Sequence, residues 1–186
     1  MEMATSLAGA IDAKDPYTKD HSTSVSRYSE ALARAINLPE DEVQRIKLGA
    51  LLHDVGKIGI PENVLKKPSH LSDEEWEIMK QHPVIAEKVL APNEALRDLI
   101  PMVKYHHEHY DGSGYPEKLK GEEIPLSARI VSVADAYHAL ISDRPYRKGL
   151  GVEKACEILR MGAGTQWDSD LVRQFITIAP SLSTSI

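Results

Sequence analysis

The sequence predicts a single all-α domain, and two observations favour this fold class. Apolar residues recur at helical spacing through most of the 186-residue chain; in residues 25–38, for example, Val25, Tyr28, Leu32 and Ile36 fall on one face. No stretch alternates apolar and polar residues with the period of two that is typical of a half-buried strand. Because there is no repeat or linker, we expect one domain over residues 1–180 and a frayed tail over 181–186.

Prolines, glycines and capping residues set the expected helix boundaries. Pro39 begins a helix with acidic residues in its first turn, and Gly56 is expected to end it. Ser72 and Glu75 have the spacing of a capping box, and Pro83 should kink or restart the helix that they open. Further helices are expected over residues 93–110, 126–142, 152–162 and 169–179.

Composition limits the classes of function. The apolar share of 42% and charged share of 27% are ordinary for a folded cytoplasmic protein, which is the location we expect. A net charge of -6 argues against binding a nucleic-acid polymer, but not against a small anionic substrate in a cleft with local cations. The one cysteine, Cys156, excludes an internal disulfide and is expected to be buried. No apolar run approaches the roughly 20 residues of a membrane span.

Histidines and aspartates gather at helix ends and inside apolar helices. Asp135, in "SVADAY", would be a costly lone carboxylate if it were buried without a partner. The side chains of adjacent helical residues point roughly 100° apart. A neighbouring pair such as His53 and Asp54 can therefore bind two adjacent ions more easily than it can bind one ion with both side chains. Mixed imidazole and carboxylate ligands suit first-row transition metals. The candidate group comprises His21, His53, Asp54, His82, His106, His107 and Asp135.

Each of these histidines taken alone is more often a surface or hydrogen-bonded residue than a ligand. The joint pattern is different, because a His-Asp pair with Lys57 close by, a His-His pair and an aspartate in an apolar helix have no simple structural explanation. The other three histidines lack such contexts and are expected at the surface or in packing. They are His70, His109 and His138.

Six segments of the chain resemble the HD-GYP family, a branch of the HD metal-dependent phosphohydrolases. They are "DPYTKDHS", "HDVGKIGIP", "QHP", "HHEHYDGSGYP", "VADAYHAL" and "SDRPYRKG". Their order and spacing match the family over about residues 10–180. The resemblance implies a helical HD-type fold with a GYP loop beside a metal cleft. It also implies hydrolysis of cyclic di-GMP, a bacterial second messenger.

By this resemblance, all seven candidate residues are metal ligands and Asp54 bridges two ions. Some members bind a third ion through a Glu four residues before the first histidine; Tyr17 stands there in this chain, so two ions are expected. Iron or manganese is favoured, although zinc or nickel could use the same ligands. Asp54 and Lys57 would be catalytic, and Lys57 would contact the scissile phosphate or help the leaving oxygen. The alternative for Lys57 is a solvated lysine after a helix.

The resemblance also implies substrate contacts. Arg144 and Arg147 would clamp phosphates with their guanidinium groups, unless they only form surface salt bridges. Gly114 and Tyr115 would form a lip over the cleft, serving substrate access and contact with a GGDEF-type cyclase domain, unless the segment is merely a tight turn. Tyr115 lies eight residues beyond His107, so we expect it at the rim rather than as a ligand. The glycines lack the GK[ST] element of an ATPase phosphate loop.

Three readings of the function stay open. The first is a phosphodiesterase that converts cyclic di-GMP to pGpG, GMP or both. The second is an HD phosphohydrolase acting on another cyclic dinucleotide or on a nucleotide. The third is a receptor that binds a cyclic dinucleotide with little or no turnover. Family members usually carry an N-terminal sensory or receiver domain. We therefore expect either an output domain whose full-length form carries such a domain or a short stand-alone form.

Overall fold

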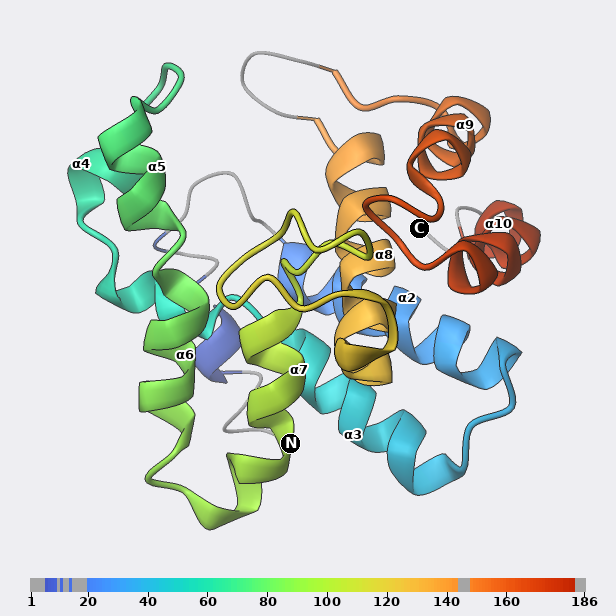
Figure 1. Cartoon of the computed structure of the whole chain (residues 1–186), viewed down its shortest axis with the longest axis horizontal. Coiled ribbons are helices and arrows are strands. Elements are labelled where there is room, and N and C mark those ends of the chain that lie inside the picture. The colour runs from blue at the N-terminus through green and yellow to red at the C-terminus, as the bar shows by residue number, and fades with distance from the viewer. Residues whose placement is uncertain (1–5, 10, 12–13, 15–19, 144–147, 183–186) are drawn as a thin grey trace.

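The structure is a computed structural model that describes residues 6–9, 11, 14, 20–143 and 148–182. Within these residues the chain is helical and forms no β-strand, which confirms the predicted fold class (Figure 1). The α-helices are α2 (His21–Ala35), α3 (Glu40–Leu51), α4 (Glu62–Leu65), α5 (Asp73–Met79), α6 (His82–Leu90), α7 (Ile100–Tyr105), α8 (Leu126–Ile141), α9 (Val152–Gly162) and α10 (Ser169–Leu182). The 3-10 helices are η1 (Val55–Gly59), η2 (Glu94–Leu99) and η3 (Gly121–Glu123).

Helix α8 lies at the centre of the domain, where α2, α3, α7, α9 and α10 all contact it (Figure 1). Its buried side chains include Ile130, Val133, Ala134 and Tyr137, which recur at helical spacing. Such a helix needs neighbours on several sides, because each fully buried Val or Ile stabilises the fold by about 1.5–3 kcal/mol. Asp135 therefore stands on the element that the rest of the domain surrounds.

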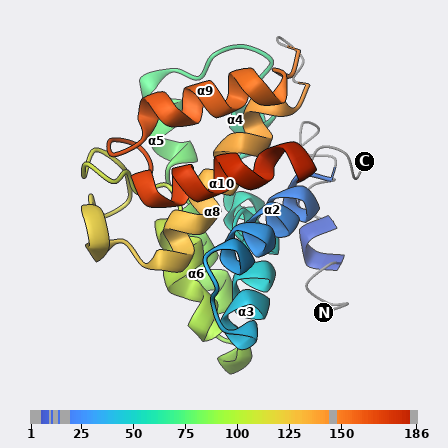
Figure 2. The ribbon, with the colours of Figure 1, turned by 90° about the vertical axis from the view of Figure 1, so that its right-hand side faces the viewer.

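Three aromatic rings fix the C-terminal helix against α2. The Tyr137 ring lies 5.3 Å from Tyr28 and 4.9 Å from Phe175, both in edge-to-face geometry. Edge-to-face pairs contribute about 0.5–1.5 kcal/mol beyond simple burial. Figure 2 shows the result, with α10 lying between α9 and α2. The only phenylalanine of the chain thereby supports the helix that begins with His21.

Gly56 does not end α3, so the predicted helix boundary there is wrong. Helix α3 ends at Leu51, and Gly56 lies within η1. A Cβ atom added at Gly56 would lie 1.8 Å from the carbonyl oxygen of His82 and 2.6 Å from the backbone nitrogen of Ala86. Glycine is therefore required because the backbones of η1 and α6 are in direct contact.

The other boundary predictions are correct in part. Ser72 and Glu75 form the predicted capping box at the start of α5, and the chain restarts as α6 with Pro83 in its first turn. The predicted helix over residues 93–110 is divided into η2 and α7, and α7 ends at Tyr105, directly before His106. Helix α10 extends to Leu182, and residues 183–186 of the predicted tail lie outside the described residues.

A small second cluster of apolar side chains holds the hairpin of α4 and α5 beside α6 (Figure 1). Its buried residues are Ile60, Val64 and Leu65, against which Met79 and Ile85 pack. Its three buried residues lie along the chain between Asp54 and His82. It therefore fixes the path that joins two of the candidate ligands.

Two expectations from composition can be compared with the structure. Cys156 is buried and forms no disulfide with any described residue, as predicted. Among the described helices, none combines the length and the apolar character needed to cross a bilayer.

Candidate metal centre

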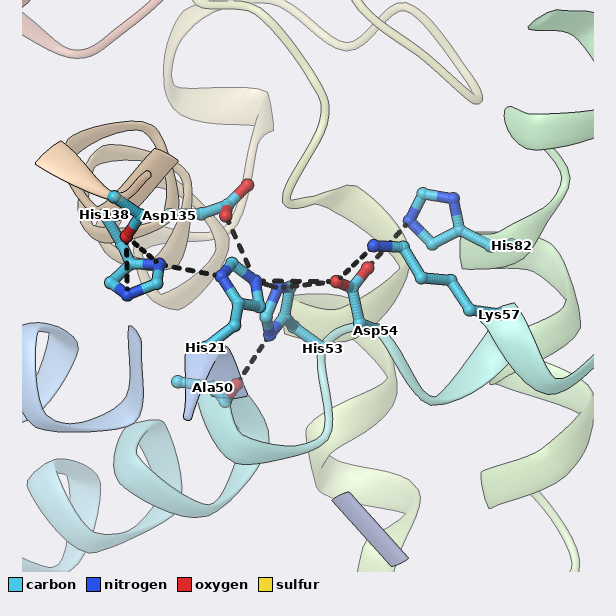
Figure 3. A network of polar contacts seen from close by, with 9 residues as sticks. His21, Ala50, His53, Asp54, Lys57, His82, Asp135 and His138 are labelled. Carbon is cyan, nitrogen blue, oxygen red and sulfur yellow. Dashed lines mark hydrogen bonds and ion pairs between the residues drawn. The ribbon is translucent and has the colours of Figure 1, made fainter. Parts of the chain in front are cut away.

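The carboxylate of Asp54 lies between the candidate ligands (Figure 3). Its Oδ2 is 3.3 Å from His53 Nε2 and 3.5 Å from His21 Nε2. Its Oδ1 is 3.4 Å from His82 Nε2. Asp54 is buried, and it follows the last turn of α3 at the point where η1 begins. The two oxygens of one carboxylate therefore face different sets of imidazoles.

Two groups of donor atoms share Asp54, and within each group the atoms lie within 4.8 Å of one another. The first group comprises His21, His53 and Asp54, and the second comprises Asp54, His82, His106 and His107. Asp135 joins the first group, since its Oδ1 lies 3.4 Å from His21 Nε2. The structure thus brings all seven candidate residues together, from five parts of the chain.

Backbone carbonyls at helix ends orient three of the imidazoles. The Nδ1 atoms of His53, His82 and His106 lie 2.7, 2.8 and 2.8 Å from the carbonyl oxygens of Ala50, Met79 and Val103, in that order. Carbonyls in the last turn of a helix lack intrahelical partners, so they can accept the Nδ1 proton. With its proton on Nδ1, each ring has its lone pair on Nε2, the nitrogen that a metal ion would use.

The second group contains buried nitrogen atoms that the protein itself leaves without a hydrogen bond. Among the described residues, neither Nε2 of His82 nor Nε2 of His106 has a hydrogen-bond partner. A buried polar atom without a partner costs about 1–3 kcal/mol. A divalent cation would accept both lone pairs, and imidazole with carboxylate is a suitable donor set for first-row transition metals. The residues present therefore fit a metal site.

The charge states of the ligands suit a cation. Burial lowers the pKa of His82 to about 4 and that of His106 to about 3, so both rings are neutral near pH 7. Burial raises the pKa of Asp54, but Lys57 and His53 outweigh it and hold the pKa well below its usual range. For His53, burial by itself would lower the pKa, but the nearby Asp54 carboxylate raises it to about 9. A cation at His53 would therefore displace a proton.

The segment that follows Asp54 is held by a lysine from the N-terminal part of the chain. Lys57 Nζ lies 2.8 Å from Asp54 Oδ2. Lys14 Nζ donates to the carbonyl oxygens of Lys57, Ile58 and Ile60 at 3.3, 2.7 and 3.1 Å. A cation at the C-terminal end of a helical turn is electrostatically favourable. Lys14 thus secures the turn that carries Lys57.

The loop after α7 folds back onto the two adjacent histidines. Tyr115 donates its backbone N–H to the carbonyl oxygen of His107 at 3.2 Å, and its ring stacks on the His107 ring. The Glu108 carboxylate accepts the N–H of Glu117 at 2.7 Å. A Cβ atom at Gly114 would lie 2.2 Å from the backbone nitrogen of His109. Close backbone approach therefore requires Gly114; its contact with substrate stays a prediction, as does that of Tyr115.

His138, expected at the surface or in packing, instead contacts a candidate ligand. Its Nδ1 lies 2.9 Å from His21 Nδ1 (Figure 3). A signal for this contact was present in the sequence, because His138 follows Asp135 by three residues and so shares its helix face. The other two histidines agree with the prediction. His70 is exposed, and His109 is partly buried against Ser113.

Three residues from the sequence predictions lie outside the described residues. They are Tyr17, Arg144 and Arg147. The expectations of a phosphate clamp and of two ions rather than three therefore stay predictions. A hydrogen bond joins the residues that flank this segment: the Asp143 carboxylate accepts the backbone N–H of Gly149 at 2.7 Å.

The chain is similar to known proteins over most of its length. The model of the family described as "HD domain" matches residues 6–171. The chain is 41% identical over 169 residues to the cyclic di-GMP phosphodiesterase response regulator RpfG of Xanthomonas campestris, covering 90% of this chain and 45% of that protein. It is 35% identical over 168 residues to 3'3'-cGAMP-specific phosphodiesterase 3 of Vibrio cholerae, covering 90% of this chain and 36% of that protein.

A solved structure has the same fold. Bd1817, a HDG"Y"P protein from Bdellovibrio bacteriovorus, superposes with a TM-score of 0.71 at 25% sequence identity, covering 86% of this chain and 51% of that chain. The chain spans less than half the length of the two curated relatives above. These relatives therefore contain further sequence that has no counterpart in the 186 residues.

Proposed function

Since this chain belongs to the HD domain family, we propose that it is a metal-dependent phosphodiesterase domain that hydrolyses cyclic dinucleotides. The resemblance to the HD-GYP branch is confirmed by the family match and by the similarity to Bd1817. The observation that carries the proposal is the position of Asp54, whose two carboxylate oxygens face two separate imidazole groups. One buried anion between two clusters of imidazole nitrogens is suited to hold two cations close together.

We propose cyclic di-GMP as the substrate. The HD-GYP motifs support it, and so does the 41% identity to a protein named as a cyclic di-GMP phosphodiesterase. The competing substrate is 3'3'-cGAMP, because another relative is named as specific for that dinucleotide. Both substrates contain phosphodiesters that join two nucleosides in a ring, so the same centre could attack either. The bases would decide between them.

The proposed cofactor is a pair of divalent ions, iron or manganese, held by the two groups that share Asp54. When bound, such ions lower the pKa of a coordinated water and neutralise charge on the phosphoryl oxygens. The protein supplies the ligands and their orientation. Asp54 also compensates the charge of two neighbouring cations, which would otherwise repel each other.

Lys57 has a separate role in the proposal. Its ammonium group lies 2.8 Å from Asp54 Oδ2 and carries three donors, so it can bind the carboxylate and a phosphoryl oxygen together. Arg144 and Arg147 would clamp the phosphates of the substrate, while Gly114 and Tyr115 would form the rim. The GYP loop is also the proposed contact for a GGDEF-type cyclase domain. The cytoplasmic location and an N-terminal sensory domain stay predictions.

Turnover by the metal-loaded chain tests this proposal. Protein loaded anaerobically with Fe²⁺, or with Mn²⁺, is incubated separately with cyclic di-GMP and 3'3'-cGAMP, and the products are separated by chromatography. We expect cyclic di-GMP to be opened to pGpG, with or without further conversion to GMP, and faster than 3'3'-cGAMP is opened. Faster turnover of 3'3'-cGAMP would reverse the choice of substrate and leave the class of reaction intact.

Two variants make the test specific. Asp54→Asn keeps the shape of the side chain but removes the charge between the two groups, so it should show no turnover. His70→Ala changes an exposed histidine and should match the unmodified protein. Binding of cyclic di-GMP without turnover, by protein that holds its metal ions, would contradict the enzyme and favour the receptor.

A further inference from the structure

His21 differs from three other candidate ligands in how its ring is held. The Nδ1 atoms of His53, His82 and His106 each lie against a backbone carbonyl three residues earlier. His21 is the first residue of α2, as His82 is of α6, and residue 18, three positions before His21, lies outside the described residues. The Nδ1 of His21 lies instead 2.9 Å from the Nδ1 of His138, on a different helix.

The surroundings of His21 identify which nitrogen faces the centre. Nε2 lies 3.2 Å from His53 Nε2, 3.4 Å from Asp135 Oδ1 and 3.5 Å from Asp54 Oδ2. Three donor atoms of the kind that bind metals therefore converge on Nε2. A nitrogen that binds a cation uses its lone pair, so the single proton of a neutral His21 ring must be on Nδ1.

That proton needs an acceptor, and the structure offers one. Two ring nitrogens 2.9 Å apart cannot both carry a proton, so His21 Nδ1–H donates and His138 Nδ1 accepts. The proton of a neutral His138 then resides on Nε2, which lies 3.0 Å from Ser142 Oγ. The polar contacts thus run from the metal centre through His21 to His138 (Figure 3). They continue from His138 to Ser142, which caps the C-terminal end of α8.

We propose that His138 is a positioning residue for the metal centre: it accepts the Nδ1 proton of His21 and so holds Nε2 of that ring toward the cation. The inference rests on the metal centre of the proposed function. In this proposal His138 accepts the Nδ1 proton of His21, as the helix-end carbonyls do for His53, His82 and His106. A hydrogen-bonded partner on the far nitrogen fixes the tautomer and the orientation of a ligating imidazole.

Helix α8 therefore holds His21 on two sides. Asp135 Oδ1 lies beside Nε2, and His138 lies beside Nδ1. The two residues are three apart on one helix face, and α8 packs directly against α2. The rings of His21 and His138 are tilted by 59° with centroids 4.9 Å apart, so the contact is made at the ring edges rather than by stacking. This geometry favours hydrogen bonding over simple packing.

A matched pair of variants separates the hydrogen bond from packing. In His138→Asn the amide oxygen is bonded to Cγ, as Nδ1 is in histidine, so an acceptor remains at the same distance along the side chain. In His138→Leu a methyl group stands there and the acceptor is lost. His70→Leu makes the same change at an exposed histidine and serves as the control.

Cobalt binding is the measurement, because Co²⁺ reports occupancy and ligand geometry without turnover. We expect the unmodified protein to bind two Co²⁺ ions. In His138→Leu the first group, which contains His21, should lose affinity by roughly 10–100-fold, while the second group keeps its affinity. In His138→Asn both affinities should stay close to those of the unmodified protein. A paramagnetically shifted, exchangeable N–H signal from His21 should be present in the Asn variant and exchange faster in the Leu variant.

The outcomes distinguish this inference from the proposed function. If the unmodified protein binds no Co²⁺, both are wrong. If it binds two ions and His138→Leu binds both with unchanged affinity and an unchanged N–H signal, the metal centre stands and the role of His138 is wrong. Equal losses in the Asn and Leu variants would show packing rather than an acceptor. If circular dichroism shows that the Leu variant is unfolded, His138→Ala replaces it with the same expected loss.

Discussion

The ring of Tyr115 is stacked on that of His107, with centroids 4.9 Å apart and planes inclined by 24°. The tyrosine predicted to stand at the rim of the cleft therefore touches a candidate metal ligand. It does so through the face of its ring. Its hydroxyl would not ionise readily near neutral pH, because burial raises the pKa of Tyr115. Tyr115 is thus suited to support His107 rather than to bind a cation.

Replacing Tyr115 should loosen the second group without emptying it. Stacked aromatic pairs contribute about 0.5–1.5 kcal/mol, so Tyr115→Ala should weaken Co²⁺ binding at that group by roughly 2- to 13-fold. Tyr115→Phe keeps the ring and should behave like the unmodified protein. Titration with Co²⁺ measures both variants. Complete loss of the ions from a folded Tyr115→Ala protein would mean that the loop supplies a ligand.

Asp54→Ala should abolish hydrolysis of cyclic di-GMP. The substitution removes the anion that lies between the two groups, so two cations would face each other with less compensation. Turnover is compared at matched metal content, which is established by elemental analysis of the same samples. Near-normal turnover with both ions present would contradict the bridging position of this carboxylate.

The arginines of the segment "DRPYR" should affect binding of substrate and leave the metal centre unchanged. Charge-assisted hydrogen bonds contribute about 1.5–3 kcal/mol, so Arg144→Ala and Arg147→Ala should each weaken affinity for cyclic di-GMP by roughly 10- to 150-fold. Calorimetry measures the affinity, and elemental analysis measures the metal content. Unchanged affinity in both variants would assign the two side chains to surface ion pairs.

A methyl group at Gly56 should destabilise the fold. In Gly56→Ala the new Cβ would lie 1.8 Å from the carbonyl oxygen of His82, and backbone atoms cannot move aside as a flexible side chain can. Overpacking of this kind typically costs about 1–3 kcal/mol, which denaturant unfolding would measure. Gly9→Ala is the control, because a Cβ there meets nothing within 4 Å. Equal stability of the two variants would show that η1 and α6 can separate at no cost.

Lys14 should influence catalysis from a distance. Lys14→Met removes the ammonium group that donates to three carbonyl oxygens at the end of η1, so the turn bearing Lys57 should lose order. We expect lower turnover of cyclic di-GMP with both metal ions retained. Lys14→Arg keeps the positive charge and should recover part of the loss. Normal turnover in Lys14→Met would show that Asp54 alone is sufficient to place Lys57.

Helical spacing and capping residues were sufficient to predict most of the fold. The capping box at Ser72 and the break at Pro83 depend on a few neighbouring residues, so the sequence reveals them directly. The end of α3 could not be found in this way. Gly56 is required by the backbone of α6, a segment far along the chain, whereas a local rule assigns that glycine to a helix terminus.

The candidate site shows the same division between local and distant causes. The seven candidate ligands could be selected because they fall at helix ends or in apolar helices and within motifs that resemble the HD-GYP family. The contact between His138 and His21 joins residues 117 positions apart, and the stacking of Tyr115 on His107 depends on how a loop folds back. The local signal that pointed to His138 was its helix-face spacing from Asp135.

The helix-end carbonyls that accept protons from three of the histidines have a consequence for protein engineering. Ala50, Met79 and Val103 take part through backbone oxygens, so their side chains can be exchanged without changing the acceptor. Transplanting the seven ligand side chains onto another helical scaffold would be insufficient, because three of the rings would lack the helix-end carbonyls that orient them. A successful graft would have to carry those helix ends with it.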